Sequence, residues 1–367
     1  MKKVAIITMC GNSNYGNKLQ NYALQETLTR YDLNVYTIWN ETFEFYSKRH
    51  VRIIIQQLKN IVNHIFGRNY HYTRYKYFIR FNNSFLKYYK TKIYSNKYDA
   101  LINKFDCFFI GSDQIWKYTT QGPWFGTYEF GLFEESKKMF SYAASFGISE
   151  IPETKREIYN KGLNHMNKIS VREQNAVSMV KDLSGRTDAR WVLDPTMLLP
   201  KDKWSALSLK PKFVEENEKY ILVYFLGKSV YINTLRRIAL EKGLKIICLN
   251  NGSYESFHSG PREFVYLFEH AEMIITDSFH ACTFSLIFEK PFYVFERKDN
   301  ELSMLSRIDS LLSRYDLLDR KITDLNEISF DCLELSDEIK SRIVLDKNNS
   351  LKFIEECINE EKTWPIQ

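Results

Sequence analysis

The chain has 367 residues, 44% hydrophobic and 15% aromatic, a composition that excludes a disordered protein and leaves room for two globular domains. Its formal net charge of +6 is uneven, because the segment 45–98 holds twelve Lys or Arg residues and no acidic residue. The rest of the chain then carries 39 basic and 45 acidic side chains, a balance that argues against a nucleic-acid-binding protein.

In the first half of the chain, short apolar runs alternate with helical stretches. Apolar runs that end in small polar residues predict buried strands at 4–9, 35–39, 106–111, 138–145 and 168–171. Apolar positions three or four residues apart predict helices at 18–30 and 172–181.

The basic segment interleaves its cations with aromatic residues, as in "FGRNYHYTRYKYFIRFNNSFLKYYKTKIYSNKY". Aromatic residues three or four positions apart predict a helical insertion, in which the rings pack inward and the cations are solvated. The absence of acidic residues nevertheless favours an anionic neighbour, such as a membrane surface or the diphosphate of a lipid carrier. Both interpretations stay open.

After a polar stretch between Pro200 and Lys219, the alternation restarts. The pattern predicts strands at 220–227, 245–250, 273–276 and 292–295, and helices at 231–242, 262–269 and 279–288. Repeated βα units predict a parallel sheet covered by helices. The whole chain is therefore predicted to be α/β, with two Rossmann-like domains facing a cleft and ligands bound outside the carboxyl ends of the strands.

The six cysteines are scattered and include no CxxC pair, so neither a zinc site nor a disulfide framework is indicated. The apolar run near the N-terminus is too short for a signal peptide, and no stretch is long enough to span a membrane. We therefore expect a protein of the reducing cytoplasm.

A glycine- and asparagine-rich turn, "GNSNYGNKLQNYAL" at 11–24, joins the first strand to the first helix. Its two glycines have the spacing of a phosphate-binding loop, but Lys18 comes one residue too late and no Ser or Thr follows it. Side-chain amides and free N–H groups suit hydroxyl-rich ligands as well as anions. Helix capping explains one asparagine but not three. The candidate ligand-binding residues are Asn14, Tyr15 and Asn17.

The stretch "MIITDSFHACTFSLIFEKPFYVF" places a histidine directly after a strand. Ser278 is a good N-cap residue, so His280 falls in the first turn of an apolar helix, where free N–H groups and the positive end of the dipole point outward. Such an arrangement can bind an anion and move a proton. The alternative is a structural histidine, because the dipole lowers its pKa and weakens any charged role.

Two further loops follow predicted strands. Arg172 begins a helix, where a bound anion would offset its unfavourable interaction with the dipole, although an ion pair with Glu173 explains it equally well. The loop "GSDQIW" at 111–116 presents a carboxylate, an amide and an aromatic ring, groups that bind sugars through hydrogen bonds and stacking. Its candidates are Asp113, Gln114 and Trp116, and a simple turn role is the alternative for Asp113.

Six motifs occur in the order and approximate spacing of the polysaccharide pyruvyl transferase family, which this chain resembles. They lie within residues 4–295, about four fifths of the chain, and are "GNSNYGNKLQNYAL", "FFIGSDQIW", "SYAASFG", "SVRE", "LDPTMLL" and "TDSFHACTFSLIFEKPF". The residue after the histidine is often glycine in the family and is Ala281 here, a mild departure at the start of the helix.

The resemblance implies a two-domain fold similar to that of GT-B glycosyltransferases. It places the acceptor side in 1–205 and the donor side in 206–330, with a helical segment at 331–367 that crosses back to the first domain. The implied reaction moves the pyruvyl group of phosphoenolpyruvate onto a sugar of a surface polysaccharide precursor as a cyclic ketal and releases phosphate. Members act in capsule, exopolysaccharide or cell-wall polymer assembly, and the chemistry needs no metal or other cofactor.

The family's anion-binding arginine and histidine fall on Arg172 and His280. A donor with a carboxylate and a phosphate suits a site made of Arg172, Ser278 and His280, in which His280 holds the phosphate or donates a proton. Asp113 would then lie near the acceptor hydroxyls. The other expected acceptor-binding residues are Asn14, Tyr15, Asn17, Gln114 and Trp116.

In the same interpretation, residues 45–98 face a lipid-linked sugar acceptor at the inner surface of the cell membrane. Two other functions stay open: a GT-B glycosyltransferase that uses a nucleotide sugar, and a non-catalytic sugar- or membrane-binding protein of the same fold. The presence of both Arg172 and His280 argues against the non-catalytic protein.

Overall fold

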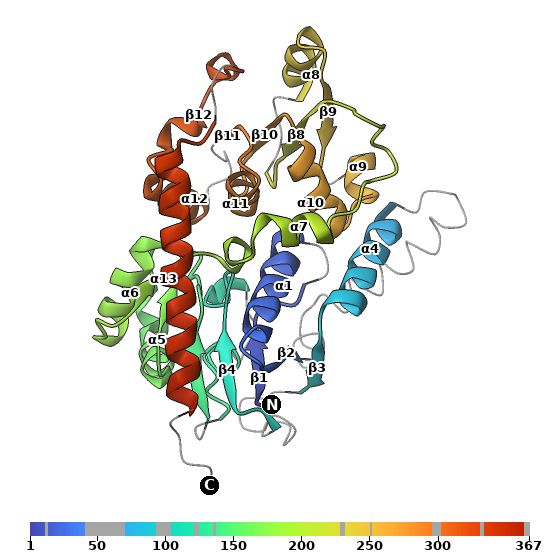
Figure 1. Cartoon of the computed structure of the whole chain (residues 1–367). Helices are drawn as coiled ribbons and strands as arrows, with labels where there is room; N and C mark the ends of the chain where they lie inside the picture. The colour runs from blue at the N-terminus through green and yellow to red at the C-terminus, as the bar shows by residue number, and fades with distance from the viewer. Residues whose placement is uncertain are drawn as a thin grey trace.

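The computed structural model describes residues 1–11, 14–40, 70–92, 104–120, 125–134, 137–227, 232–249, 252–295, 302–330 and 334–362. Each half of the chain builds one five-stranded parallel sheet, and helices pack around both sheets (Figure 1). The α/β class and the two Rossmann-like sheets predicted from the sequence are thus confirmed.

In the first sheet the strand order is β3-β2-β1-β4-β5, the order of the first five strands of a Rossmann sheet. Its strands are β1 (Lys3–Ile7), β2 (Asn34–Asn40), β3 (Tyr88–Thr91), β4 (Cys107–Ile110) and β5 (Lys138–Ser141). A short parallel pair, β6 (Ser170–Val171) and β7 (Arg190–Trp191), continues beyond β5 through isolated bridges. The edge strand β3 corrects the prediction of a wholly helical insertion at 45–98, of which residues 45–69 and 93–98 lie outside the described part of the chain.

The second sheet has the order β12-β11-β10-β8-β9, which is the order of flavodoxin-like sheets. Its strands are β8 (Tyr220–Tyr224), β9 (Lys245–Cys248), β10 (Met273–Thr276), β11 (Phe292–Phe295) and β12 (Lys321–Ile322). Each sheet has one topological switch point, where successive strands begin to be added on the opposite side of the first strand. It lies between β1 and β4 in the first sheet and between β8 and β10 in the second. These are the positions where open α/β sheets bind ligands.

The helices of the first half cover the first sheet and reach toward the second. They are α1 (Tyr15–Thr29), α4 (Tyr70–Phe85), α5 (Glu153–His165) and α6 (Gln174–Ser184). Those that follow are α7 (Lys201–Leu207), α8 (Ile232–Glu241), α9 (Tyr254–Phe257), α10 (Pro261–His270), α11 (Phe279–Ile287), α12 (Leu302–Arg314) and α13 (Asp337–Lys362). No helix in the described ranges is long and apolar enough to cross a membrane.

One apolar cluster joins the two halves. Tyr22 of α1 and Phe81 of α4 belong to the same buried cluster as Trp204 of α7, Phe264 of α10 and Phe284 of α11. Helix α4 lies beside α9 and α10 and packs Phe78 and Phe81 inward, as their spacing predicts, whereas Tyr75 is exposed. The two halves therefore share an apolar contact. Helix α7, which spans the expected boundary at residue 205, packs against α10 of the second half.

The last helix, α13, returns to the first sheet and runs along one side of the molecule (Figure 1). Phe353 and Cys357 are buried in a cluster with Val4 of β1 and Phe109 of β4. Burial of these apolar side chains stabilises the docked helix. Ion pairs of Glu360 with Lys138 and Lys168, and of Glu356 with Arg190, also join it to the first half.

Candidate functional site

Polar side chains from both halves meet where the strands of the two sheets end. Asn17 lies in the first turn of α1, after β1, and Asp113 follows β4. Arg172 follows β6, and His280 lies in the first turn of α11, after β10. Asn17 and Asp113 follow the two strands at the switch point of the first sheet, and His280 follows a strand at the switch point of the second. Arg172 joins them from the short β6–β7 pair, so the structure brings four of the sequence-predicted residues together.

Arg172 is enclosed by carboxylates. Its Nη1 donates to Oδ2 of Asp194 at 3.0 Å, its Nε donates to Oε1 of Glu173 at 3.3 Å, and its Nη2 lies 3.6 Å from Oδ1 of Asp113. The guanidinium carbon is 4.5 Å from the ring centre of Phe279 in α11. Burial alone would lower the pKa of Arg172, but the three carboxylates raise it, so the side chain stays charged. The ion pair with Glu173 that the sequence predicts is thus one of three contacts between Arg172 and a carboxylate.

Asp194 is a site residue that the sequence analysis missed. Its Oδ1 accepts hydrogen bonds from the N–H and the hydroxyl of Thr196, at 3.0 and 2.8 Å. Its Oδ2 accepts from Arg172 and from the Ser112 hydroxyl, and lies 3.7 Å from Nε2 of His280. Burial alone would raise the pKa of Asp194, but the neighbouring cations and the Thr196 donors lower it. Its position in the motif "LDPTMLL", just beyond β7, was the sequence signal that could have identified it as a site residue.

His280 packs directly on a glycine of the first half. A Cβ added at Gly16 of α1 would lie 2.1 Å from Nδ1 of His280 and 2.3 Å from its Cγ, so this close approach requires glycine. Burial lowers the pKa of His280, and Arg172 and Arg307 add to this, while Asp194 and Asp113 oppose it. The imidazole is therefore neutral near pH 7 and can donate or accept a proton.

Asp113 and His280 form the accessible edge of the cluster. Their side chains are 11% and 9% exposed, whereas that of Arg172 is 1% exposed. Asp113 has a left-handed backbone conformation, with φ of 57°, and its Oδ2 accepts a hydrogen bond from Nδ2 of Asn17 at 3.4 Å. Burial alone would raise its pKa, but the charges of Arg172, of His280 when it is protonated and of Arg307 outweigh that effect and lower it. Asp113 is therefore a carboxylate and can accept a proton.

Three buried polar atoms of this cluster have no hydrogen-bond partner among the described residues. They are Nη2 of Arg172, Nε2 of His280 and Oδ1 of Asn17. A buried polar group left unsatisfied costs about 1–3 kcal/mol, and native structures contain few of them. Three such atoms in one cluster indicate a place where a polar ligand binds.

Two of the predicted acceptor-binding residues lie elsewhere. Tyr15 is fully buried, its ring centre is 4.8 Å from that of Phe264, and its hydroxyl donates to the carbonyl oxygens of Ser256 and Ser259. Trp116 is also fully buried, and its Nε1 donates to the carbonyl oxygen of Glu129. The structure corrects the expectation that these rings face an acceptor, because each gains more from apolar packing than from a position at the surface.

The remaining predicted residues lie at the edge of the cluster. Asn14 is exposed and caps α1, since its Oδ1 accepts a hydrogen bond from the N–H of Asn17 at 3.2 Å. Gln114 is half-buried and lies against Gly147. Ser278 is buried at the N-cap of α11, where its side chain makes no capping hydrogen bond.

The lowered pKa of His280 makes stability depend on pH. Its folded-state pKa lies below the unfolded value of about 6.5, so the contribution of the neutral ring is complete above that pH and is lost as the pH falls toward the folded-state value. We expect the free energy of unfolding, measured in urea, to fall less between about pH 7.5 and 5.5 in His280→Gln than in the wild type. His270→Gln, at an exposed position, should keep the wild-type slope. Equal slopes in His280→Gln and the wild type would contradict this account.

Solved structures similar to the chain include enzymes that bind nucleotide sugars. A glycosyltransferase from Rickettsia africae ESF-5 has 10% identity and a TM-score of 0.47, with 99% of each chain covered. A UDP-GlcNAc 2-epimerase from Neisseria meningitidis, bound to UDP-GlcNAc, has 13% identity and a TM-score of 0.49, with 98% of this chain and 100% of that chain covered. Structural similarity at this level gives no information about the substrate or the reaction of this chain. No curated protein sequence matches the chain significantly.

A match to a protein-family model assigns the chain to a family. The model of polysaccharide pyruvyl transferases matches residues 14–300, which include the first turn of α1, the loop after β4 and the whole of α11. The match therefore covers well over half of the chain, together with all four residues that meet at the carboxyl ends of the strands. The chain belongs to the polysaccharide pyruvyl transferase family.

Proposed function

We propose that the protein transfers the pyruvyl group of phosphoenolpyruvate to a sugar of a surface polysaccharide precursor, as a cyclic ketal, and releases phosphate. Family membership gives the transferase class. The observation that supports this donor is the pair of buried, unsatisfied nitrogens, Nη2 of Arg172 and Nε2 of His280, at the interface of the two halves. Phosphoenolpyruvate carries a carboxylate and a phosphate, and both groups bind best to charge-assisted and oriented N–H donors.

In this proposal Arg172, His280 and the start of α11 hold the donor. Ser278 leaves the first-turn N–H groups of α11 without a side-chain cap, and the positive end of the helix dipole lies there. Arg172 is held by Asp194 and Glu173, so its remaining Nη2 has a fixed direction. The donor anion would complete the hydrogen bonds that these groups lack.

The reaction needs two sugar hydroxyls and no change of oxidation state. The methylene carbon of phosphoenolpyruvate takes one proton, and the neighbouring carbon becomes electrophilic. Both hydroxyl oxygens then bond to that carbon while its bond to the phosphate oxygen breaks. One hydroxyl proton balances the new methyl group and the other leaves with phosphate. In this proposal Asp113, at the accessible edge of the cluster, accepts a hydroxyl proton, and His280 supplies a proton or holds the phosphate.

Ligand protection against heat distinguishes this donor from a nucleotide sugar. We expect phosphoenolpyruvate to raise the Tm of the wild type, because a ligand that binds only the folded state stabilises it, and a nucleoside diphosphate to leave the Tm unchanged. His280→Gln should reduce the shift, and His270→Gln should keep it. Protection by the nucleoside diphosphate alone would favour a GT-B glycosyltransferase. Acceptor binding without turnover would favour a non-catalytic protein.

We further propose that the end of the basic segment contacts the anionic inner face of the cell membrane, where a lipid-linked acceptor would lie. Lys87, Lys90 and Lys92 are exposed beside or in the edge strand β3. A lysine near an anionic surface contributes about 1 kcal/mol, so replacing all three by Gln should weaken binding to phosphatidylserine vesicles roughly 100-fold.

A second triple variant is the control for net charge in the vesicle assay. It replaces three exposed lysines at and after α7 by Gln, namely Lys201, Lys203 and Lys210. We expect it to bind vesicles as the wild type does, with both variants measured by co-sedimentation. Equal loss in the two variants, or loss in neither, would contradict the proposed membrane contact.

A further inference from the structure

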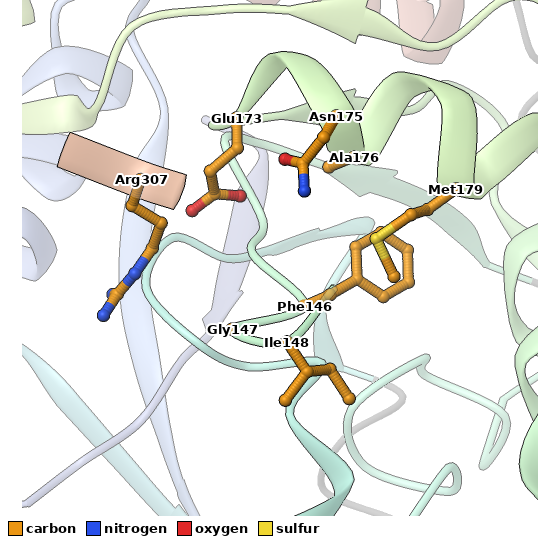
Figure 2. A pocket seen from close by; sticks show the side chains of 8 residues that line it. All are labelled: Phe146, Gly147, Ile148, Glu173, Asn175, Ala176, Met179 and Arg307. Atoms are coloured by element: carbon orange, nitrogen blue, oxygen red, sulfur yellow. The ribbon is translucent and has the colours of Figure 1, made fainter. Parts of the chain in front are cut away.

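A second buried arginine approaches the site from the C-terminal half of the chain. Arg307 lies in α12 and is 5% exposed. It lines a small pocket in which its other neighbours all come from the first half (Figure 2), namely Phe146, Gly147, Ile148, Glu173, Asn175, Ala176 and Met179. The pocket has room for about one water molecule. Arg307 therefore crosses the interface between the two halves.

The pocket borders the predicted donor site. Figure 2 shows Arg307 on the side of the pocket opposite Met179, with the Glu173 carboxylate between them. The same carboxylate accepts the hydrogen bond from Nε of Arg172. The charge of Arg307 also helps to lower the pKa of both Asp113 and His280, which places its guanidinium within electrostatic reach of the accessible edge of the cluster.

The charge of the cluster requires another cation if an anion is to bind. Arg172 is the single charged base among the contacts described above, and it faces three carboxylates, those of Asp113, Glu173 and Asp194. With a neutral His280, this group is net negative. A donor with two anionic groups would be repelled there, because electrostatic interactions are strong in a buried site.

We propose that Arg307 is a second donor-binding residue, which contacts the phosphate of phosphoenolpyruvate from the C-terminal half. This inference rests on the proposed function. Because Arg172 and Arg307 belong to opposite halves of the chain, the donor would link the two halves when it binds. Donor binding would then require the two halves to be correctly positioned relative to each other.

The test measures donor binding and acceptor binding separately. We expect Arg307→Met to raise both the KM for phosphoenolpyruvate and its calorimetric Kd roughly 10- to 100-fold, the usual effect of losing a charge-assisted hydrogen bond, and to leave the acceptor KM unchanged. Arg307→Lys, which keeps the charge, should recover part of the affinity. Arg156→Met removes an arginine that pairs with Asp182 on the surface of the first half, and should match the wild type.

The possible results distinguish a wrong role for Arg307 from a wrong donor. Wild-type affinity for phosphoenolpyruvate in Arg307→Met, with weakened binding in His280→Gln, would overturn the role of Arg307 alone. An equal rise in donor and acceptor KM that Arg307→Lys does not relieve would also overturn it, because it would indicate a purely structural residue. If the wild type binds inorganic phosphate but not phosphoenolpyruvate, the proposed donor is wrong. In that case loss of phosphate binding in Arg307→Met would still support an anion-binding Arg307, and unchanged binding would overturn it.

Discussion

Arg172→Met is expected to lower the free energy of unfolding by about 3–5 kcal/mol at neutral pH and to abolish donor binding. The physical reason is that Asp113, Glu173 and Asp194 all contact this buried guanidinium. Removing it leaves three buried carboxylates without their shared cation, and an uncompensated buried charge is strongly destabilising. Methionine replaces the length of the side chain but not its donors.

Urea denaturation of the variant at two pH values measures this effect. Burial raises the pKa of Asp113 and Asp194 and the charge of Arg172 opposes this, so without Arg172 the pKa of both rises. The destabilisation should therefore shrink as the pH falls and these carboxylates take up protons. Arg156→Met, which removes a partly exposed ion pair, should cost less than about 1 kcal/mol. A loss under about 1 kcal/mol in Arg172→Met would show that the carboxylates do not depend on this arginine.

Gly16→Ala is expected to lower kcat about 100-fold, the scale of effect when a catalytic group is displaced by about 1 Å. The added Cβ would lie 2.1 Å from Nδ1 of His280, so the imidazole must move. Alanine is otherwise favourable within a helix, and Gly16 has no left-handed backbone. Overpacking should cost stability by about 1–3 kcal/mol, so the loss of turnover would exceed the loss of folded protein.

Gly11→Ala is the matched control for this variant. Gly11 lies in the same turn, and a Cβ added there would meet no atom within 4 Å. We expect it to keep wild-type turnover and stability. Wild-type kcat in Gly16→Ala, measured by phosphate release, would contradict a catalytic position for His280.

Much of the fold could be predicted from the sequence because buried parallel strands and amphipathic helices leave strong local patterns. The strand before His280 and the helix after it are one example, since the apolar run at 273–276 coincides with β10. Strand β3 was missed because its residues, Tyr88 to Thr91, are polar or aromatic and lie at the sheet edge. The pairing of an edge strand depends on its neighbour more than on its own sequence.

The site could be predicted only in part. Asp113, Arg172 and His280 each follow a strand, and the carboxyl ends of parallel strands meet at one edge of a sheet. Asp194 was missed, and the packing of Gly16 on His280 was not predicted, because both depend on contacts across the interface of the two halves. The burial of Tyr15 and Trp116 could not be predicted either, since an aromatic residue in a polar loop can stack on a ligand or on the core.

The mass of the product tests the proposed function most directly. Purified wild-type protein would be incubated with phosphoenolpyruvate and a panel of lipid-diphosphate sugars, with phosphate release measured in parallel. We predict that one acceptor gains the mass of a single pyruvyl ketal and that one phosphate is released for each ketal formed. An acceptor that stays unmodified with phosphoenolpyruvate, but gains a sugar when a nucleotide sugar is supplied, would contradict the proposed reaction.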